Sequence, residues 1–233
     1  MAQYPIFIPV RDRLEVLAQL IAWLERAGQE EIWLIDNDST YGPLVDYLDT
    51  TPHRVVRLGR NLGHRSPWLA GVVQREAFDR PFVVTDPDVV PVEQCPLDAI
   101  DHFAAVLERH PGLHKVGFGL VIDDLPEHYP LAAEVRDWEG RFWVEEMEPG
   151  LYRADLDTTF ALYRAGLRRH EDNHAARTGG EYVARHLAWY VDPEHLSEDE
   201  AYYRAHADQT ISNWNRDRAA RWKLRHLGAE SDR

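Results

Sequence analysis

The first 90 residues alternate between short apolar runs and helix-like segments, and this alternation restricts the fold more than any other feature. Apolar runs at residues 4–10, 31–35, 54–58 and 82–84 predict strands. Strands that alternate with helices form parallel sheets, because each parallel pair needs a long crossover connection. We therefore expect an α/β domain with a mostly parallel central sheet and helices on both faces.

Capping residues and apolar residues at helical spacing predict helices in the segments between these strands. Asp12 is suited to cap the first helix, with Glu15 completing a capping box, and apolar residues at helical spacing continue to Gly28. Two shorter helices are expected at residues 43–48 and 67–78.

The second half of the chain has a less regular pattern. We expect a helix at residues 98–110 and a strand at residues 115–122. Strands at residues 151–154 and 158–163 should follow, and the polar, glycine-ended stretch at residues 168–180 predicts a mobile loop.

The C-terminal region has one clear helix start. Ser197 and Glu200 form a capping box for a helix that ends near Ala207. Residues 208–226 are helical in character and rich in arginine, and residues 227–233 are expected to be disordered.

Polar residues follow each of the four early strands. They are Arg11 and Asp12, then Asp36 to Asp38, then Asn61 and Gly63, then Asp86 and Asp88. Because the carboxyl ends of parallel strands meet at one edge of a sheet, we expect these clusters to gather there. Open α/β sheets bind ligands at that edge.

Asp86 and Asp88 form an Asp-x-Asp pair directly after a buried strand. Carboxylate oxygens are suited to Mg²⁺ or Mn²⁺. The formal net charge of −14 would repel an anionic ligand, and a bound divalent cation would offset that repulsion. The pair therefore predicts a hard-cation site.

Charge and cysteine content exclude several classes of protein. The net charge of −14 argues against nucleic-acid partners and against an anionic membrane surface. Cys95 is the single cysteine, so an intrachain disulfide is excluded, which fits a reducing compartment. We find no signal peptide and no stretch long enough to span a bilayer, and we expect a cytoplasmic protein.

Four segments together resemble the GT-A glycosyltransferase fold, and family 2-type enzymes in particular. They are the first-strand segment Ile8–Asp12, the acidic turn Leu34–Thr40, the Arg-Asn-x-Gly segment Arg60–Gly63, and Thr85–Asp88 at the family's metal motif. Their order and spacing agree with the family over residues 4–125, and the resemblance is thin beyond. It implies a Rossmann-like nucleotide-binding half at residues 1–122.

The resemblance also implies the function. A metal-dependent enzyme of this kind moves a single sugar from a nucleotide-diphosphate sugar, here foremost a UDP-sugar, to an acceptor hydroxyl in glycan or glycoconjugate biosynthesis. We expect a single catalytic domain at residues 1–226, with a smaller acceptor-side half at residues 123–207 and a C-terminal helix at residues 208–226. Donor sugar, acceptor, stereochemistry and oligomeric state stay open.

Residue roles follow from the matched positions. Residues expected to bind the nucleotide sugar are Pro9, Arg11, Asp36, Asn37, Asp38, Asn61, Gly63 and Asp86. The expected ligands of Mn²⁺ or Mg²⁺ are Asp86, Asp88 and His186. As alternatives, Asp36 and Asp38 are suited to a turn or helix cap, and His186 to simple packing.

An inverting transferase needs a carboxylate that deprotonates the acceptor hydroxyl. Asp157 is the preferred base because it opens a predicted strand, and the other candidates are Asp155, Glu145 and Glu146. Aromatic side chains that could stack on an acceptor sugar are Trp138, Trp143 and Trp189, although such residues are more often part of a core or rim.

Three alternatives remain. The segment Asp86–Val90 satisfies the Asp-x-Asp-x-Val pattern of haloacid-dehalogenase-type phosphatases, but three strand–helix units precede it, and Lys115 is poorly spaced. A sugar-nucleotide nucleotidylyltransferase would need a glycine-rich, basic loop, and residues 6–13 contain no glycine. A non-catalytic nucleotide-sugar-binding domain is the third alternative.

This chain lacks the features expected of a processive polysaccharide synthase. Residues 218–222 resemble the Gln-x-x-Arg-Trp motif of those enzymes without its glutamine, and no transmembrane segment follows. The basic residues at positions 216–225 leave peripheral membrane contact open, but a solvated helix face explains them more simply.

Overall fold

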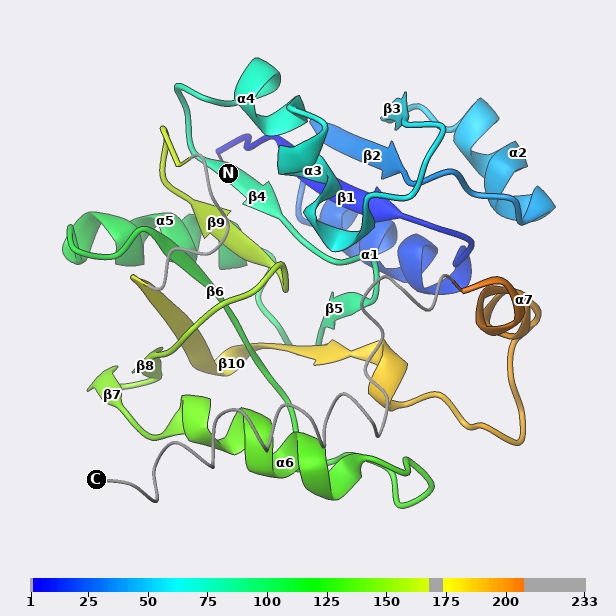
Figure 1. Ribbon diagram of the computed structural model, residues 1–233. Helices are drawn as coiled ribbons and strands as arrows, with labels where there is room; N and C mark the ends of the chain where they lie inside the picture. Colours follow the sequence, from blue (N-terminus) through cyan, green and yellow to red (C-terminus); the bar gives the residue numbers. More distant parts are fainter. Residues whose placement is uncertain (1, 168–173, 208–233) are drawn as a thin grey trace, which may run out of the picture.

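The computed structural model describes residues 2–167 and 174–207, which form an α/β fold around one mixed sheet (Figure 1). The sheet has ten strands in the order β3-β2-β1-β4-β9-β6-β10-β8-β7, and β5 pairs with β10. The strands are β1 (Ile6–Val10), β2 (Ile32–Asp36), β3 (Arg54–Arg57), β4 (Phe82–Val84), β5 (Val89–Pro91), β6 (Lys115–Leu120), β7 (Glu146–Glu148), β8 (Leu151–Arg153), β9 (Ala161–Tyr163) and β10 (Ala175–His186).

The sheet is parallel in its first block and mixed beyond it. Strands β3, β2, β1 and β4 are parallel neighbours, as the early alternation predicts. Strand β9 then runs antiparallel between β4 and β6, and β10 pairs parallel with β6 but antiparallel with β5 and β8. The register sets Val10 opposite Asp36, so β1 and β2 end level with each other.

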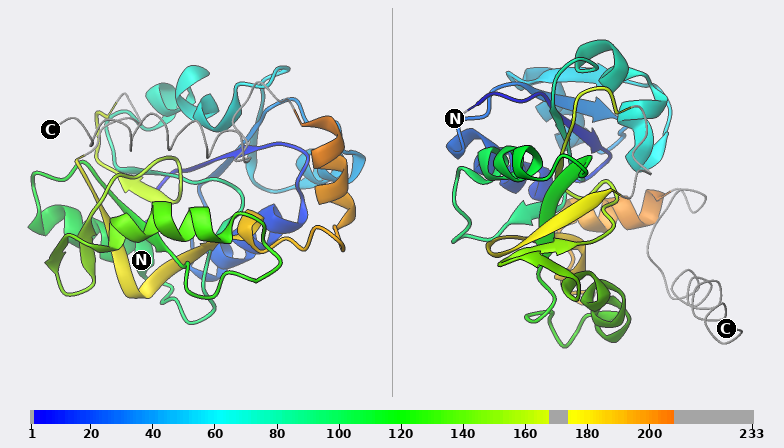
Figure 2. Two further views of the ribbon diagram at one scale, coloured as in Figure 1. Left: turned by 60° about the horizontal axis from the view of Figure 1, so that its bottom comes forward. Right: turned by 90° about the vertical axis from the view of Figure 1, so that its left-hand side faces the viewer.

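Helices cover both faces of the sheet (Figure 2). They are α1 (Glu15–Arg26), α2 (Gly42–Thr50), α3 (Ser66–Leu69), α4 (Val72–Glu76), α5 (Ala99–Arg109), α6 (Ala132–Gly140) and α7 (Glu198–His206), with 3₁₀ turns η1 (Gly63–Arg65), η2 (Arg141–Trp143) and η3 (Leu187–Trp189). Helices α1 and α5 pack on one face through Trp23 and Phe103, and α3 and α4 pack on the other through Trp68 and Val72.

The capping box predicted at the first helix is wrong. Helix α1 begins at Glu15, and Asp12 lies before it with a φ of 54°. The Asp12 carboxylate instead accepts hydrogen bonds from the backbone N–H groups of Thr40 (2.6 Å) and Tyr41 (2.8 Å) at the start of α2. Asp12 therefore holds two loops together at the carboxyl edge of the sheet.

Asp199, from the first turn of α7, takes over the cap of α1. Its Oδ2 accepts from the backbone N–H groups of Leu14 and Glu15, both at 2.8 Å. Two free N–H groups at a helix start favour a carboxylate partner, because they carry the positive end of the helix dipole. This contact joins residues about 185 positions apart and fixes α7 beside α1 (Figure 1).

Other predicted elements differ in their limits. The helix expected at residues 67–78 is divided into α3 and α4 by Gly71, whose φ of 68° ends the first piece. The loop expected at residues 168–180 is wrong from Ala175 onward, where β10 begins, and residues 168–173 lie outside the described part.

The N-cap half of the C-terminal capping box is confirmed, whereas the Glu200 carboxylate pairs with Arg13 and Arg204 instead of completing the box. Ser197 caps α7 and accepts a hydrogen bond from the backbone N–H of Glu200. The predictions for residues 208–226 and 227–233 lie outside the described residues, and the division of the chain into halves stays a prediction. None of the helices in residues 2–167 and 174–207 has the length and apolarity that crossing a membrane requires.

We expect Asp199→Ala to lower the free energy of unfolding by about 1–2 kcal/mol, because both α1 N–H groups lose their acceptor. Urea denaturation followed by circular dichroism measures this. The matched control is Glu198→Ala, which removes an exposed carboxylate from the same turn of α7. Equal stability of the two variants would contradict the assigned cap.

Candidate functional site

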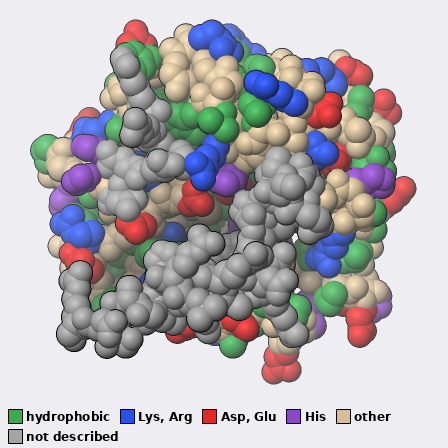
Figure 3. All heavy atoms as spheres, viewed as in Figure 1, with side chains coloured by type: hydrophobic (Ala, Val, Ile, Leu, Met, Phe, Trp, Pro, Cys, Tyr) green, Lys and Arg blue, Asp and Glu red, His purple; other side chains and the backbone are tan. Residues whose placement is uncertain are grey.

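A cleft of about 960 Å³ lies at the carboxyl edge of the parallel strands. Figure 3 shows acidic, basic and histidine side chains close together near the middle of this face. Nine of the predicted site residues line the cleft, namely Pro9, Arg11, Asn37, Asn61, Gly63, Asp86, Asp88, Asp157 and His186. The convergence expected from the polar strand ends is therefore present in the structure.

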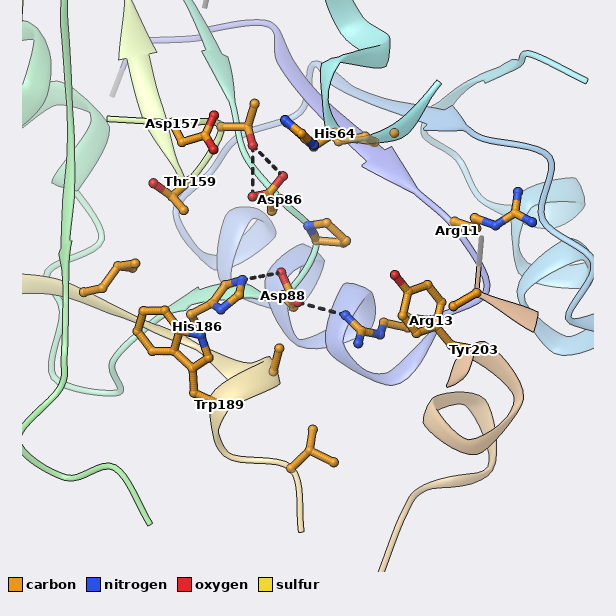
Figure 4. Close-up of a pocket in the computed structure, with 18 of the residues that line it drawn as sticks. Arg11, Arg13, His64, Asp86, Asp88, Asp157, Thr159, His186, Trp189 and Tyr203 are labelled. Atoms are coloured by element: carbon orange, nitrogen blue, oxygen red, sulfur yellow. Dashed lines mark hydrogen bonds and ion pairs between the residues drawn. The ribbon is translucent and has the colours of Figure 1, made fainter. Parts of the chain in front are cut away.

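Asp88 lies at the centre of this cleft, buried between two cationic side chains (Figure 4). Its Oδ2 accepts a hydrogen bond from Nη1 of Arg13 at 3.0 Å, and its Oδ1 lies 3.4 Å from Nε2 of His186. Burial alone would raise the pKa of Asp88, but His186 and Arg13 outweigh it and hold that pKa well below its usual range. Asp88 is thus a stable carboxylate.

Arg13 is held from a second side by α7. Its guanidinium pairs with Glu200 at 2.8 Å and lies over the ring of Tyr203 at 4.0 Å. Burial lowers the pKa of Arg13, and the carboxylates of Asp88 and Glu200 outweigh this effect, so the net shift is upward. One cation therefore links the loop after β1, the Asp-x-Asp turn and α7.

Asp86 has a different environment from Asp88. Both of its carboxylate oxygens accept from the hydroxyl of Thr158, at 3.0 Å each. Burial, together with the negative charges of Asp88 and Asp157, raises the pKa of Asp86 to about 7. The two carboxyl groups of the pair thus differ in charge near neutral pH.

His186 ends β10 and faces Asp88 across the cleft. Burial lowers the pKa of His186, but the charges of Asp88 and Asp86 outweigh burial and raise it above its ordinary value. Its Nδ1 is buried and has no hydrogen-bond partner among the described residues. The ring packs against Trp189, with 4.7 Å between the ring centroids.

Asp157 is in the loop before β9 rather than at a strand start as predicted, because β9 begins only at Ala161. The loop is nevertheless held firmly. Nζ of the fully buried Lys115 donates to the backbone oxygen of Leu156 at 2.5 Å, and the hydroxyl of Tyr163 donates to that of Asp157 at 3.3 Å. The exposed Asp157 carboxylate therefore has a defined place on the cleft wall.

The other end of the cleft is built from loops after β1, β2 and β3. Arg11 donates to the backbone oxygens of Asn37 (2.5 Å) and Asp38 (3.2 Å). The side chain of Asn37 accepts from the backbone N–H of Leu62 at 3.0 Å, and Asn61 accepts from that of Gly63 at 2.9 Å. These bonds join three strand ends into one rigid wall.

Asp36 and Asp38 were expected to read a base and ribose, but neither lines the cleft as described. Asp36 is buried, and its Oδ1 accepts from the backbone N–H of Ser39 at 2.9 Å, a local contact that closes the turn after β2. Asp38 is exposed and has a φ of 66°. The turn alternative describes Asp36 in this structure, and contact of either residue with a nucleotide sugar stays a prediction.

The remaining aromatic and acidic candidates differ in whether they line the cleft. Trp138 and Trp189 line the cleft, whereas Trp143 packs onto Gly119 and Gly179, where any added Cβ would meet its ring. Asp155 lines the cleft beside Asp157. Glu145 and Glu146 are exposed outside it, with Glu145 paired to Arg153 at 2.8 Å.

Several cleft residues carry no local sequence pattern. Arg13 lies in the loop after β1, His64 in the 3₁₀ turn η1, and Tyr203 on α7. The buried ion pair of Arg177 with Glu139 (2.6 Å) joins β10 to α6 on the far wall of the cleft. Only the tertiary structure brings these side chains to the site.

The fit of a divalent cation is incomplete. Asp86, Asp88 and His186 supply suitable oxygen and nitrogen donors. However, no three His, Cys, Asp or Glu side chains in residues 2–167 and 174–207 are grouped as a metal site, and both oxygens of Asp88 already face cations of the chain. As arranged, these residues do not form a ready-made Mn²⁺ or Mg²⁺ site.

Comparison with known proteins gives only distant structural likenesses. No family model matches the sequence, and no curated protein matches it. A mannosyltransferase from Pyrobaculum calidifontis, solved with GDP-Man and Mn²⁺, aligns with a TM-score of 0.49 and 14% identity over 88% of this chain and 65% of that chain.

Two further structures show similar levels of likeness. Glucosyl-3-phosphoglycerate synthase from Mycobacterium tuberculosis, solved with Mn²⁺ and UDP-glucose, has a TM-score of 0.43 and 13% identity over 70% of this chain and 56% of that chain. A UDP-glucose pyrophosphorylase has a TM-score of 0.48 and 10% identity over 87% of this chain and 99% of that chain.

These likenesses do not fix a family, since they include both glycosyltransferases and a pyrophosphorylase. The chain spans less than two thirds of the length of the two transferases. The function is therefore argued from the cleft itself.

We expect Asp86→Asn to stabilise the protein at pH 8 by about 2–4 kcal/mol and to have little effect at pH 4. The raised pKa means that folding favours the protonated carboxyl, so the wild type loses stability as the pH rises from 3.8 to about 7. Asparagine removes this loss and still accepts from Thr158. Urea denaturation at both pH values measures the difference, and a variant less stable at pH 8 would contradict it.

Proposed function

We propose that the protein is a glycosyltransferase that moves a single sugar from a nucleotide-diphosphate sugar, foremost a UDP-sugar, to an acceptor hydroxyl. The observation that supports this most is the composition of the cleft. It joins the loops after β1 to β3 at one end, a charged centre at Asp88, and an exposed carboxylate at Asp157. A volume of about 960 Å³ is sufficient for a donor and part of an acceptor.

The proposed chemistry uses groups of this chain. The acceptor oxygen attacks the anomeric carbon while the bond from that carbon to the diphosphate oxygen breaks. Asp157 takes the acceptor proton on an inverting route. The side chains of Arg11, Arg13 and His186 line the cleft, and the two arginines, together with His186 when it is protonated, would stabilise the negative charge that develops on the leaving diphosphate.

The expected Mn²⁺ or Mg²⁺ stays a prediction. A cation that binds Asp86, Asp88 and His186 would add positive charge beside the diphosphate. At Asp88 this cation would compete with Arg13 and His186, which already contact the two carboxylate oxygens.

The three alternative functions need different residues or carry out different reactions. A haloacid-dehalogenase-type phosphatase needs a lysine beside its nucleophile, but Lys115 is buried outside the cleft and donates to Leu156. A nucleotidylyltransferase would exchange pyrophosphate with a nucleoside triphosphate, and a binding domain would hold the donor without turnover. These reactions are assayed with the same purified protein.

We expect one nucleoside diphosphate among UDP, GDP, dTDP and CDP to raise the melting temperature, because a ligand that binds only the folded state stabilises it. A thermal-shift panel with and without Mn²⁺ measures this. Nucleoside-diphosphate sugars carrying the selected base are then incubated with simple glycosides, and a transferred sugar is detected by mass spectrometry. No shift with any diphosphate, together with phosphate release from phosphomonoesters, would overturn the proposal.

The identity of the carboxylate that deprotonates the acceptor is tested by substituting two neighbouring carboxylates of the cleft. We expect Asp157→Asn to lower kcat about 10²- to 10⁴-fold while leaving the affinity for the nucleoside diphosphate unchanged. Asp155→Asn is the matched control and should retain most of kcat, since Asp155 is a weaker candidate on the same loop. A larger loss in Asp155→Asn would move the base to that residue.

A further inference from the structure

Arg13 is a cleft residue that no sequence motif singles out. It follows β1 by three positions, and its guanidinium is mostly buried, with 17% of the side chain exposed. Figure 4 shows it facing Asp88 from the side opposite to His186. Arg13 therefore occupies the centre of the proposed donor site rather than its rim.

The place of Arg13 does not depend on Asp88 alone. Glu200 pairs with its Nε at 2.8 Å and accepts from its Nη2 at 3.2 Å, and the ring of Tyr203 lies against its flat face at 4.0 Å. These contacts come from α7 and persist if Asp88 changes its partner. The positive charge is therefore built into the site.

Arg13 still has hydrogen-bond donors to offer. Each terminal nitrogen of a guanidinium carries two N–H groups. Asp88 uses one at Nη1 and Glu200 uses one at Nη2, so a second N–H remains at each nitrogen. Two parallel N–H groups match two oxygens of a phosphate, and such paired contacts are stronger than a single hydrogen bond.

We propose that Arg13 binds the diphosphate of the nucleotide donor and lets the cleft bind nucleoside diphosphates without a divalent cation. The inference rests on the proposed function, because the ligand is the leaving group of that reaction. It follows from the two contacts of Asp88. A divalent cation on Asp88 would compete with Arg13 and His186 for its two oxygens, whereas a diphosphate on Arg13 leaves both contacts intact.

The experiment measures UDP and UMP affinity by isothermal titration calorimetry, in EDTA and again in Mn²⁺. If the thermal-shift panel selects another base, the corresponding diphosphate and monophosphate are used. In EDTA the wild type should bind the diphosphate about 10- to 100-fold more tightly than the monophosphate, which is the gain expected for charged hydrogen bonds to the second phosphate.

Arg13→Met should reduce this ratio to about 1–2 while the monophosphate affinity stays within about 2-fold. Arg13→Lys keeps the positive charge but lacks the two parallel N–H groups of the guanidinium, so it should restore only part of the ratio. The matched control is Arg80→Gln, which breaks an arginine–glutamate pair with Glu31 outside the cleft and should leave the ratio unchanged.

A purely structural role for Arg13 predicts a different result. If Arg13 only fixes α7, then Glu200→Gln and Arg13→Met should weaken the diphosphate and monophosphate equally. Equal losses, or a wild type that binds the diphosphate only with Mn²⁺, would overturn the inference and leave the transferase proposal standing. A wild type that binds no nucleoside diphosphate in either buffer would overturn the proposed function itself.

Discussion

Two buried carboxylates hold the segment that follows β1, and the rest of the cleft depends on them. Asp12 accepts from the N–H groups at the start of α2, and Asp199 accepts from those at the start of α1. Buried backbone N–H groups need such acceptors, since leaving them unpaired costs free energy. The chain presents Arg11 to one end of the cleft just before the first anchor, and Arg13 to the centre of the cleft between the two anchors.

The centre of the cleft is a chain of opposite charges. Glu200, Arg13, Asp88 and His186 follow one another from α7 to the end of β10. Each charge is partly buried and each has a neighbour of opposite sign, so none bears the full cost of losing its water. Asp86 has no cationic partner of this kind and instead has its hydroxyl contact with Thr158, which explains why it differs from Asp88 in proton affinity.

The sequence predicts local features of the fold better than long-range ones. The early strands and their polar ends are predictable because each strand is a short apolar run and parallel strands share an edge. The capping role of Asp12 is not, because the backbone N–H groups that donate to its carboxylate lie 28 and 29 residues away in sequence. Strand β10 begins with Ala175 and contains Gly179 and Gly180, so only its neighbours β6 and β8 make it a strand. Arg13 likewise has no local pattern.

The contact between Asp199 and the start of α1 has a consequence for how the chain folds. It joins positions 14 and 199, and the contacts of His186 with Asp88 and of Thr158 with Asp86 also link distant parts of the chain. Contacts of large sequence separation raise the contact order and slow folding. During synthesis the early strands emerge well before α7, so a nascent chain has the strand ends of the cleft without its central ion pairs.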